Sequence, residues 1–253
     1  MKLSGAGRIL FWRGGSLWIG LAGEPTRSHA FHAILVALPF PRGRAQFQDS
    51  SGGWMSYSAA LVPTHRPHAF EARGQQVALI FVEPESLEGR NLQRLFPNES
   101  IVALPSDVLE MPIFSLATAY EGRARDADLI ALARTAVATL SGAALEPPTP
   151  PDARIARAVE LVRQKLNDAI SLSAIAAAVR LSPDRFRHLF MKQTGVGFRA
   201  YVLWRRPECA LAAYAAGKTL TEAAHIGGFA DSAHFSRTFR RMFGITPASI
   251  RLE

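Results

Sequence analysis

The sequence predicts an α+β protein of two domains: an N-terminal antiparallel β-barrel with helices, and a C-terminal all-α domain with two helix-turn-helix motifs. Three observations predict this fold class. Short apolar runs broken by glycine and proline fill the first half of the 253 residues, whereas helical periodicity fills the second. A cluster of prolines separates the halves. The net charge of +8 lies entirely in the second half.

The N-terminal half has a strand-like texture. Its apolar runs, at residues 8–12, 17–21, 33–38, 54–62 and 77–82, are separated by glycines and prolines. This spacing is typical of an antiparallel sandwich or barrel.

Helical texture begins only after Gly89. Residues 91–96 predict a short helix, and residues 126–140 predict a longer one with its leucines and alanines on one face. We expect that apolar face to pack on the barrel or on a second subunit.

Residues 146–152, Glu-Pro-Pro-Thr-Pro-Pro-Asp, predict a stiff, extended linker because proline disrupts the interior of helices and sheets. They separate an N-terminal domain at residues 1–145 from a C-terminal domain at residues 153–253. Residues 1–150 carry 13 basic and 13 acidic side chains, whereas residues 151–253 carry 16 and 8. A basic surplus confined to one domain points to a polyanionic partner of that domain.

Composition excludes several classes of protein. With 48% hydrophobic and 20% charged residues, the chain is not wholly disordered. The single cysteine, Cys209, allows no intrachain disulfide and fits a reducing compartment. The longest uncharged apolar run, residues 33–40, is too short to span a bilayer, and the N-terminus is unlike a signal peptide. We therefore expect a soluble, cytoplasmic protein with no membrane partner.

The basic half contains an internal repeat. Residues 171–194 and 219–243 match at an offset of 48 residues before a turn and 49 after it. Each copy predicts a helix-turn-helix, since Ser171 and Thr219 can cap the first helices. Ser182, followed by a proline, and Asp231 can cap the second helices.

The second helix of each copy has an apolar and a polar face. Phe186/Phe190 and Phe235/Phe239 are i, i+4 pairs that predict a buried face, and glycines at 195 and 244 predict left-handed helix ends. The opposite faces carry residue types that hydrogen-bond base edges or phosphates. The candidate DNA-binding residues are Asp184, Arg185, Arg187, His188, Lys192, Ser232, His234, Ser236, Arg237 and Arg240.

The second copy carries a recognisable motif. Gly228-Phe229 is followed by the polar residue Asp231, then by His-Phe, Phe-Arg, Gly-x-x-Pro and a closing Arg251. With this motif, residues 155–251 resemble the DNA-binding domain of AraC/XylS-type transcriptional regulators. The resemblance implies that both second helices enter successive major-groove segments of double-stranded DNA, with a long helix joining the two copies.

The joining segment departs from that family's pattern. Arg206 and Ala210 match family positions, but Pro207 stands where the family has an apolar residue. A proline inside a helix removes a hydrogen bond and costs roughly 3 kcal/mol. The sequence therefore predicts either a kinked connector or a helix divided near Arg206.

Four histidines lie in the N-terminal half, as His29/His32 and His65/His68. A histidine-bearing barrel is similar to a cupin, but cupin metal sites use His-x-His, which places both rings on one face of a strand. An i, i+3 pair in a strand faces opposite ways. We therefore expect no metal, no other cofactor and no catalytic residue.

Residues 63–70 resemble the turn of the cupin-like sensor barrels that precede such DNA-binding domains. The nearby aromatic residues either line a ligand pocket or fill the core, and the sequence leaves both open. They are Phe31, Phe47, Trp54, Tyr57, Phe70 and Phe81.

The leading hypothesis is a sequence-specific, DNA-binding transcriptional regulator, not an enzyme. Its barrel would bind a small-molecule effector and act by differential affinity for two domain arrangements. A homodimer and an interaction with RNA polymerase are further expectations. Two alternatives remain: a cupin-type metal enzyme fused to a DNA-binding domain, and a regulator whose N-terminal domain only dimerises.

Overall fold

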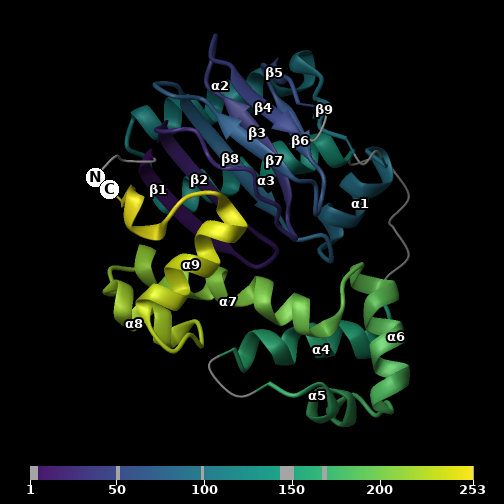
Figure 1. Cartoon of the computed structure of the whole chain (residues 1–253). Coiled ribbons are helices and arrows are strands. Elements are labelled where there is room, and N and C mark those ends of the chain that lie inside the picture. Colours follow the sequence, from purple (N-terminus) through teal and green to yellow (C-terminus); the bar gives the residue numbers. More distant parts are fainter. Residues whose placement is uncertain (1–4, 50–51, 98–99, 143–150, 167–169, 253) are drawn as a thin grey trace. The chain divides into compact units, whose positions relative to one another are not determined.

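The computed structural model describes residues 5–49, 52–97, 100–142, 151–166 and 170–252 (Figure 1). Two compact units form: Met1–Glu146 with Phe239–Glu253, and Pro147–Thr238. The division falls within helix α9 (Ser232–Phe243), so the end of the chain groups with the N-terminal unit. Most of the linker predicted at residues 146–152 lies outside the described residues, and the domain boundaries at 145 and 153 stay a prediction.

The N-terminal unit is built on two β-sheets. A seven-stranded sheet has the order β10-β1-β2-β8-β3-β6-β9, and a three-stranded sheet has the order β5-β4-β7. Apart from the parallel pair β1–β10, all strand pairs are antiparallel. The strands are β1 (Gly5–Trp12), β2 (Gly15–Ala22), β3 (Ile34–Pro39), β4 (Ala45–Asp49), β5 (Trp54–Tyr57), β6 (Ala60–Val62), β7 (His68–Glu71), β8 (Gln76–Val82), β9 (Val102–Ala103) and β10 (Ile250–Leu252).

Three helices complete this unit: α1 (Leu87–Leu95), α2 (Ser106–Glu121) and α3 (Asp126–Ser141). Helix α3 matches the longer predicted helix, and its buried Leu129, Ala133 and Val137 join the same apolar core as Leu17 and Ile80 of the large sheet. In Figure 1, α2 and α3 lie behind that sheet. Helix α2 was not predicted from sequence.

The α+β class is therefore confirmed for the N-terminal half, as a β-rich domain with helices. Hydrogen bonding does not join the described strands into one closed barrel, because they divide between the two sheets. Aromatic contacts link the sheets: Phe31 lies against both His68 of β7 and Phe81 of β8, with ring centroids 5.1 and 5.2 Å away.

The other unit is helical, as predicted. It comprises α4 (Ala153–Gln164), α5 (Leu172–Ala178), α6 (Pro183–Thr194), α7 (Phe198–Ala215), α8 (Leu220–Ile226) and the first part of α9. Ser171 and Ser182 cap α5 and α6, accepting backbone N–H bonds as expected. Thr219 forms a full capping box with Glu222 at the start of α8.

Pro207 lies inside α7, which runs unbroken from Phe198 to Ala215. The helix is therefore not divided near Arg206. Because proline has no N–H, the carbonyl of Leu203 lacks its usual partner one turn later. Leu203 itself is an exposed residue of the helix.

Helices α7 and α8 approach closely at Gly227. A Cβ built there would lie 2.7 Å from the Cβ of Ala210 and 2.8 Å from the carbonyl oxygen of Arg206. We expect Gly227→Ala to lower the free energy of unfolding by about 1–3 kcal/mol, because the backbone would have to move apart. Thermal unfolding followed by circular dichroism measures this. Gly53→Ala, at a glycine with open space around it, is the control; equal stability of Gly227→Ala and wild type would contradict the close approach.

Candidate functional site

Helix α6 presents its predicted polar face to solvent. Phe186 and Phe190 are fully buried, which turns the opposite face outward. Arg187 donates to the Asp184 carboxylate at 2.6 Å, an i, i+3 ion pair in which both side chains are more than half exposed. Such a pair contributes at most about 1 kcal/mol, so a stronger anion can displace it. The exposed candidates on this helix are Asp184, Arg185, Arg187, His188 and Lys192.

Helix α9 follows the same plan. The Asp231 carboxylate accepts the backbone N–H of His234 at 2.6 Å and caps the helix. That bond is the main reason why the pKa of Asp231 lies below its usual value, and nearby Arg237 adds to it. Phe235 and Phe239 are fully buried.

The remaining candidates on α9 differ in exposure. His234, Arg237 and Arg240 are exposed, whereas Ser232 and Ser236 are half-buried. His234 also packs edge-on against Phe229 of the turn, with ring centroids 5.2 Å apart. The two helices thus place arginine and histidine side chains where a groove of DNA could meet them; which of the ten residues touch DNA stays a prediction.

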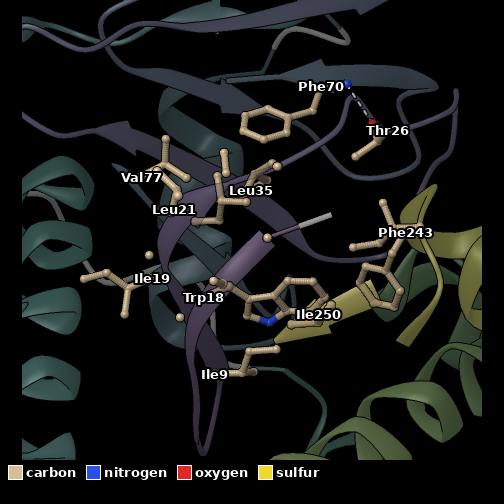
Figure 2. Close-up of a pocket in the computed structure, with 18 of the residues that line it drawn as sticks. Ile9, Trp18, Ile19, Leu21, Thr26, Leu35, Phe70, Val77, Phe243 and Ile250 are labelled. Atoms are coloured by element: carbon tan, nitrogen blue, oxygen red, sulfur yellow. Dashed lines mark hydrogen bonds between the residues drawn. The ribbon is translucent and has the colours of Figure 1, made fainter. Parts of the chain in front are cut away.

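The N-terminal unit contains an apolar cavity of about 110 Å³ (Figure 2). Strands β1, β2 and β8 supply much of its wall, including Ile19 and Val77. The end of the chain supplies the rest: Phe243, Ile245 and Ile250. Trp18 lies between these groups, with its ring 5.2 Å from that of Phe243. In Figure 2, Trp18, Phe243 and Ile250 lie together beside β2.

The tail residues could not be foreseen as lining, because their contacts are long-range. Phe243 ends α9, and the N–H of Arg27 donates to the carbonyl of Gly244. Strand β10 then pairs with β1, with Ile250 opposite Gly5. No local pattern in the sequence signals that pairing.

The predicted aromatic residues divide among three environments. Phe31, Phe70 and Phe81 line the cavity, so they are pocket residues. Phe47 and Tyr57 are buried and pack against each other with ring centroids 5.9 Å apart. Trp54 is 43% exposed, so it neither lines the cavity nor fills the core.

The four histidines pair across the sequence. His29 and His68 exchange two backbone hydrogen bonds of 2.9 Å, and both line the cavity. Their rings are tilted relative to each other, with centroids 4.4 Å apart. His32 instead meets His65, Nδ1 to Nε2 at 3.0 Å, and its Nε2 lies 2.5 Å from the Glu85 carboxylate. The two members of each i, i+3 pair thus contact different residues. The sequence did not indicate that Glu85 would lie next to His32.

Burial determines the protonation state of His29 and His68. It lowers the pKa of His29 to about 3, with repulsion from His68 adding and the Arg27 carbonyl opposing. It lowers the pKa of His68 to about 4, against a hydrogen bond to the Arg66 carbonyl. Both rings are therefore neutral at pH 7. Within the described ranges, no three His, Cys, Asp or Glu side chains are grouped to hold a metal ion.

Comparison with known proteins identifies relatives of the helical half of the chain. The family described as a helix-turn-helix domain matches residues 175–253. The regulatory protein PocR of Salmonella typhimurium is 32% identical over 108 residues, 42% of this chain and 35% of PocR. The arabinose operon regulatory protein of the same organism is 30% identical over 163 residues, 57% of this chain and 55% of that protein. The C-terminal part of the chain is an AraC-type helix-turn-helix domain.

Both regulators thus share the AraC-type domain with this chain. The matched segments cover only about a third to a half of the length of each regulator. A solved structure extends the likeness of fold beyond it. ToxT from Vibrio cholerae superposes with a TM-score of 0.56 at 12% identity, covering 92% of this chain and 95% of ToxT. At that identity the likeness is one of fold, and it confirms the architecture of a β-rich domain followed by a helical helix-turn-helix domain.

Proposed function

We propose that the protein is a sequence-specific DNA-binding transcriptional regulator whose N-terminal unit binds a small effector. The observation that carries the proposal is the exposed basic face of α6 and of α9 within an AraC-type domain. The planar guanidinium group of arginine can form two parallel hydrogen bonds with the edge of a guanine or with a phosphate. The net charge of +8 lies in this half of the chain.

The effector part of the proposal is supported by the apolar cavity and by the fold shared with ToxT. One ToxT structure has an unsaturated fatty acid bound, and another a naphthalenyl butenoic acid. A cavity lined by apolar side chains with a few polar groups is the usual form of a ligand site. The proposed regulator has no catalytic role, and its curated relatives are regulators.

The proposal also includes partners. DNA binding would place the protein in the cytoplasm, with RNA polymerase as a contact at promoters. Every helix in the described ranges is too short or too polar to cross a bilayer. A homodimer is supported by exposed apolar side chains on α2, namely Val108, Met111 and Phe114. Light scattering of the full chain measures the dimer directly.

Selection of bound duplexes from a random pool tests DNA binding while the operator is still unidentified. We expect one enriched motif, bound at least about 1,000-fold more tightly than random DNA at physiological salt, as specific regulators are. Enrichment of no motif would contradict the proposal. Genome-wide mapping of bound sites then identifies the regulated genes.

Lys192→Ala should weaken binding to every DNA sequence about equally. Lys192 is exposed on the last turn of α6, where a long flexible ammonium reaches phosphate rather than base edges. Losing one phosphate contact lowers the slope of log affinity against log salt by about 0.9. Arg44→Ala, which removes one positive charge from the N-terminal unit, should leave the slope unchanged. A wild-type slope for Lys192→Ala would remove this residue from the phosphate contacts.

A further inference from the structure

We infer that His188 on helix α6 recognises bases by their amino groups, and so prefers adenine or cytosine to guanine or thymine on the DNA strand that it faces. The inference deepens the proposed function and rests on it, because His188 can contact a base only if α6 enters the major groove. Its basis is the hydrogen bond that holds the imidazole ring, since that bond decides what the other ring nitrogen can do.

The imidazole of His188 is held at one nitrogen by the backbone of its own helix. Its Nδ1 lies 2.9 Å from the carbonyl oxygen of Asp184, one turn earlier. Because a carbonyl oxygen can only accept, Nδ1 carries the proton. In the neutral ring Nε2 then has no hydrogen, and it acts as an acceptor.

The same bond sets the direction of Nε2. The two nitrogens of an imidazole point in widely different directions in the plane of the ring. Since Nδ1 points back to the helix backbone and His188 is exposed, Nε2 points away from the helix. An acceptor that is already oriented loses little conformational freedom when it binds.

The position of His188 suits contact with a base. It lies in the first half of α6, and the N-terminal part of such a recognition helix is the part that contacts base edges. Its ring is bonded to the main chain of Asp184, whereas the carboxylate of that residue is bonded to Arg187. DNA can therefore displace the Asp184–Arg187 ion pair and leave the ring of His188 in place.

The four bases differ in what they present to an acceptor. In the major groove, adenine presents the amino group at N6 and cytosine the one at N4, whereas guanine and thymine present the oxygens O6 and O4. Nε2 of His188 can accept from an amino group, but it meets a carbonyl oxygen lone pair to lone pair. Arg187, the preceding residue, has only donors and suits guanine. Two adjacent residues of α6 thus favour opposite classes of base.

Selection of duplexes from a random pool by the full-length protein and two variants tests the inference. The selection is run at pH 8, above the range in which histidine ordinarily gains its proton. At one position of the wild-type motif we expect adenine or cytosine to be favoured about five- to tenfold, which is the gain typical of one hydrogen bond. His188→Ala should abolish the preference at that position alone. His188→Arg, which offers only donors, should convert the preference to guanine or thymine.

Gln193→Ala is the matched control on the same helix. Gln193 is directed elsewhere, since its Oε1 accepts the backbone N–H of Asp152 at 3.3 Å, and this variant should keep the whole motif. Circular dichroism verifies that the variants fold, as expected for an exposed position. Three results would each overturn the inference: an unchanged motif in His188→Ala, a wild-type guanine or thymine at the position that His188→Ala abolishes, or a retained preference for amino bases in His188→Arg.

Removal of the amino group from the DNA connects the preference to that group. In the selected operator, purine replaces adenine at this position, or 2-pyrimidinone replaces cytosine, because neither analogue has the amino group. Wild type should lose about as much affinity as His188→Ala loses on the unmodified operator, and His188→Ala should lose little more on the modified one. Losses that simply add would show that His188 and the amino group act independently, which would overturn the inference.

The same selection separates the two proposals. An enriched motif in which no position shows the preference that depends on His188 would refute the inference and leave the proposed regulator standing. Enrichment of no motif by wild type would refute the proposed regulator, and the inference with it.

Discussion

Lowering the pH from 6.5 to 5 should destabilise the N-terminal unit by about 3 kcal/mol. The histidines His29 and His68 are buried as neutral rings, with pKa values lowered from 6.5 to about 3 and about 4. The unfolded chain takes up protons near pH 6.5 and the folded chain does not. Each ring then contributes a slope of up to about 1.4 kcal/mol per pH unit.

The sign follows from the direction of the shifts. The stability that comes from keeping these rings neutral is complete above pH 6.5, and it is lost as the pH falls toward the folded pKa values. Burial, followed by repulsion from His32, lowers the pKa of His65 as well and adds in the same direction. The carboxylates titrate mainly below this interval.

Urea unfolding at pH 7, 6 and 5 measures the effect. Three of the four tryptophans, at 12, 18 and 54, lie in the N-terminal unit, so a Trp204→Phe background makes fluorescence report on it alone. His29→Asn and His68→Asn keep a donor for the neighbouring carbonyl but cannot be protonated, and the double variant should flatten the dependence on pH. His225→Asn serves as the control. A double variant as pH-sensitive as wild type would show that other groups cause the loss.

Replacing Arg187 and Arg237 together by alanine should weaken binding to the selected operator by about 2–6 kcal/mol, since one arginine–base contact is worth about 1–3 kcal/mol. Both side chains are exposed on the polar faces of α6 and α9. Arg187 forms a surface ion pair with Asp184, which DNA can displace at little cost. Binding to random DNA should fall less, because only phosphate contacts operate there.

Lysine substitutions distinguish base reading from phosphate contact. Arg187→Lys and Arg237→Lys keep the charge but lose the planar fork, so they should reduce specificity more than affinity for random DNA. Gel-shift titrations with operator and random duplexes give both numbers, and circular dichroism verifies the fold. Operator affinity unchanged in the double alanine variant would remove both arginines from the interface.

Local signals made the helical half predictable. Caps such as Ser182 and Asp231 and the i, i+4 phenylalanine pairs lie within one or two turns of each other, so sequence alone predicts both second helices and their outward faces. Helix α2 was missed, since Pro112 lies inside it and argues against helix.

Long-range contacts explain what the sequence could not predict. His29 and His32 contact different residues, and no pattern in the sequence indicated that the ring of His29 would lie against His68 or that His32 would reach Glu85. Tertiary pairing also decides that Phe31 faces a cavity while Phe47 fills the core.

The parallel pairing of β1 and β10 limits how modular this chain can be. A fragment that stops at residue 145 would leave β1 as an unprotected edge strand, which invites aggregation, and would remove Phe243, Ile245 and Ile250 from the cavity wall. Chimaeras that graft this N-terminal unit onto another regulator should therefore carry residues 239–252 along with it. The segment that has to be transferred is therefore discontinuous in sequence, because strand β10 supplies part of the cavity wall through Ile250.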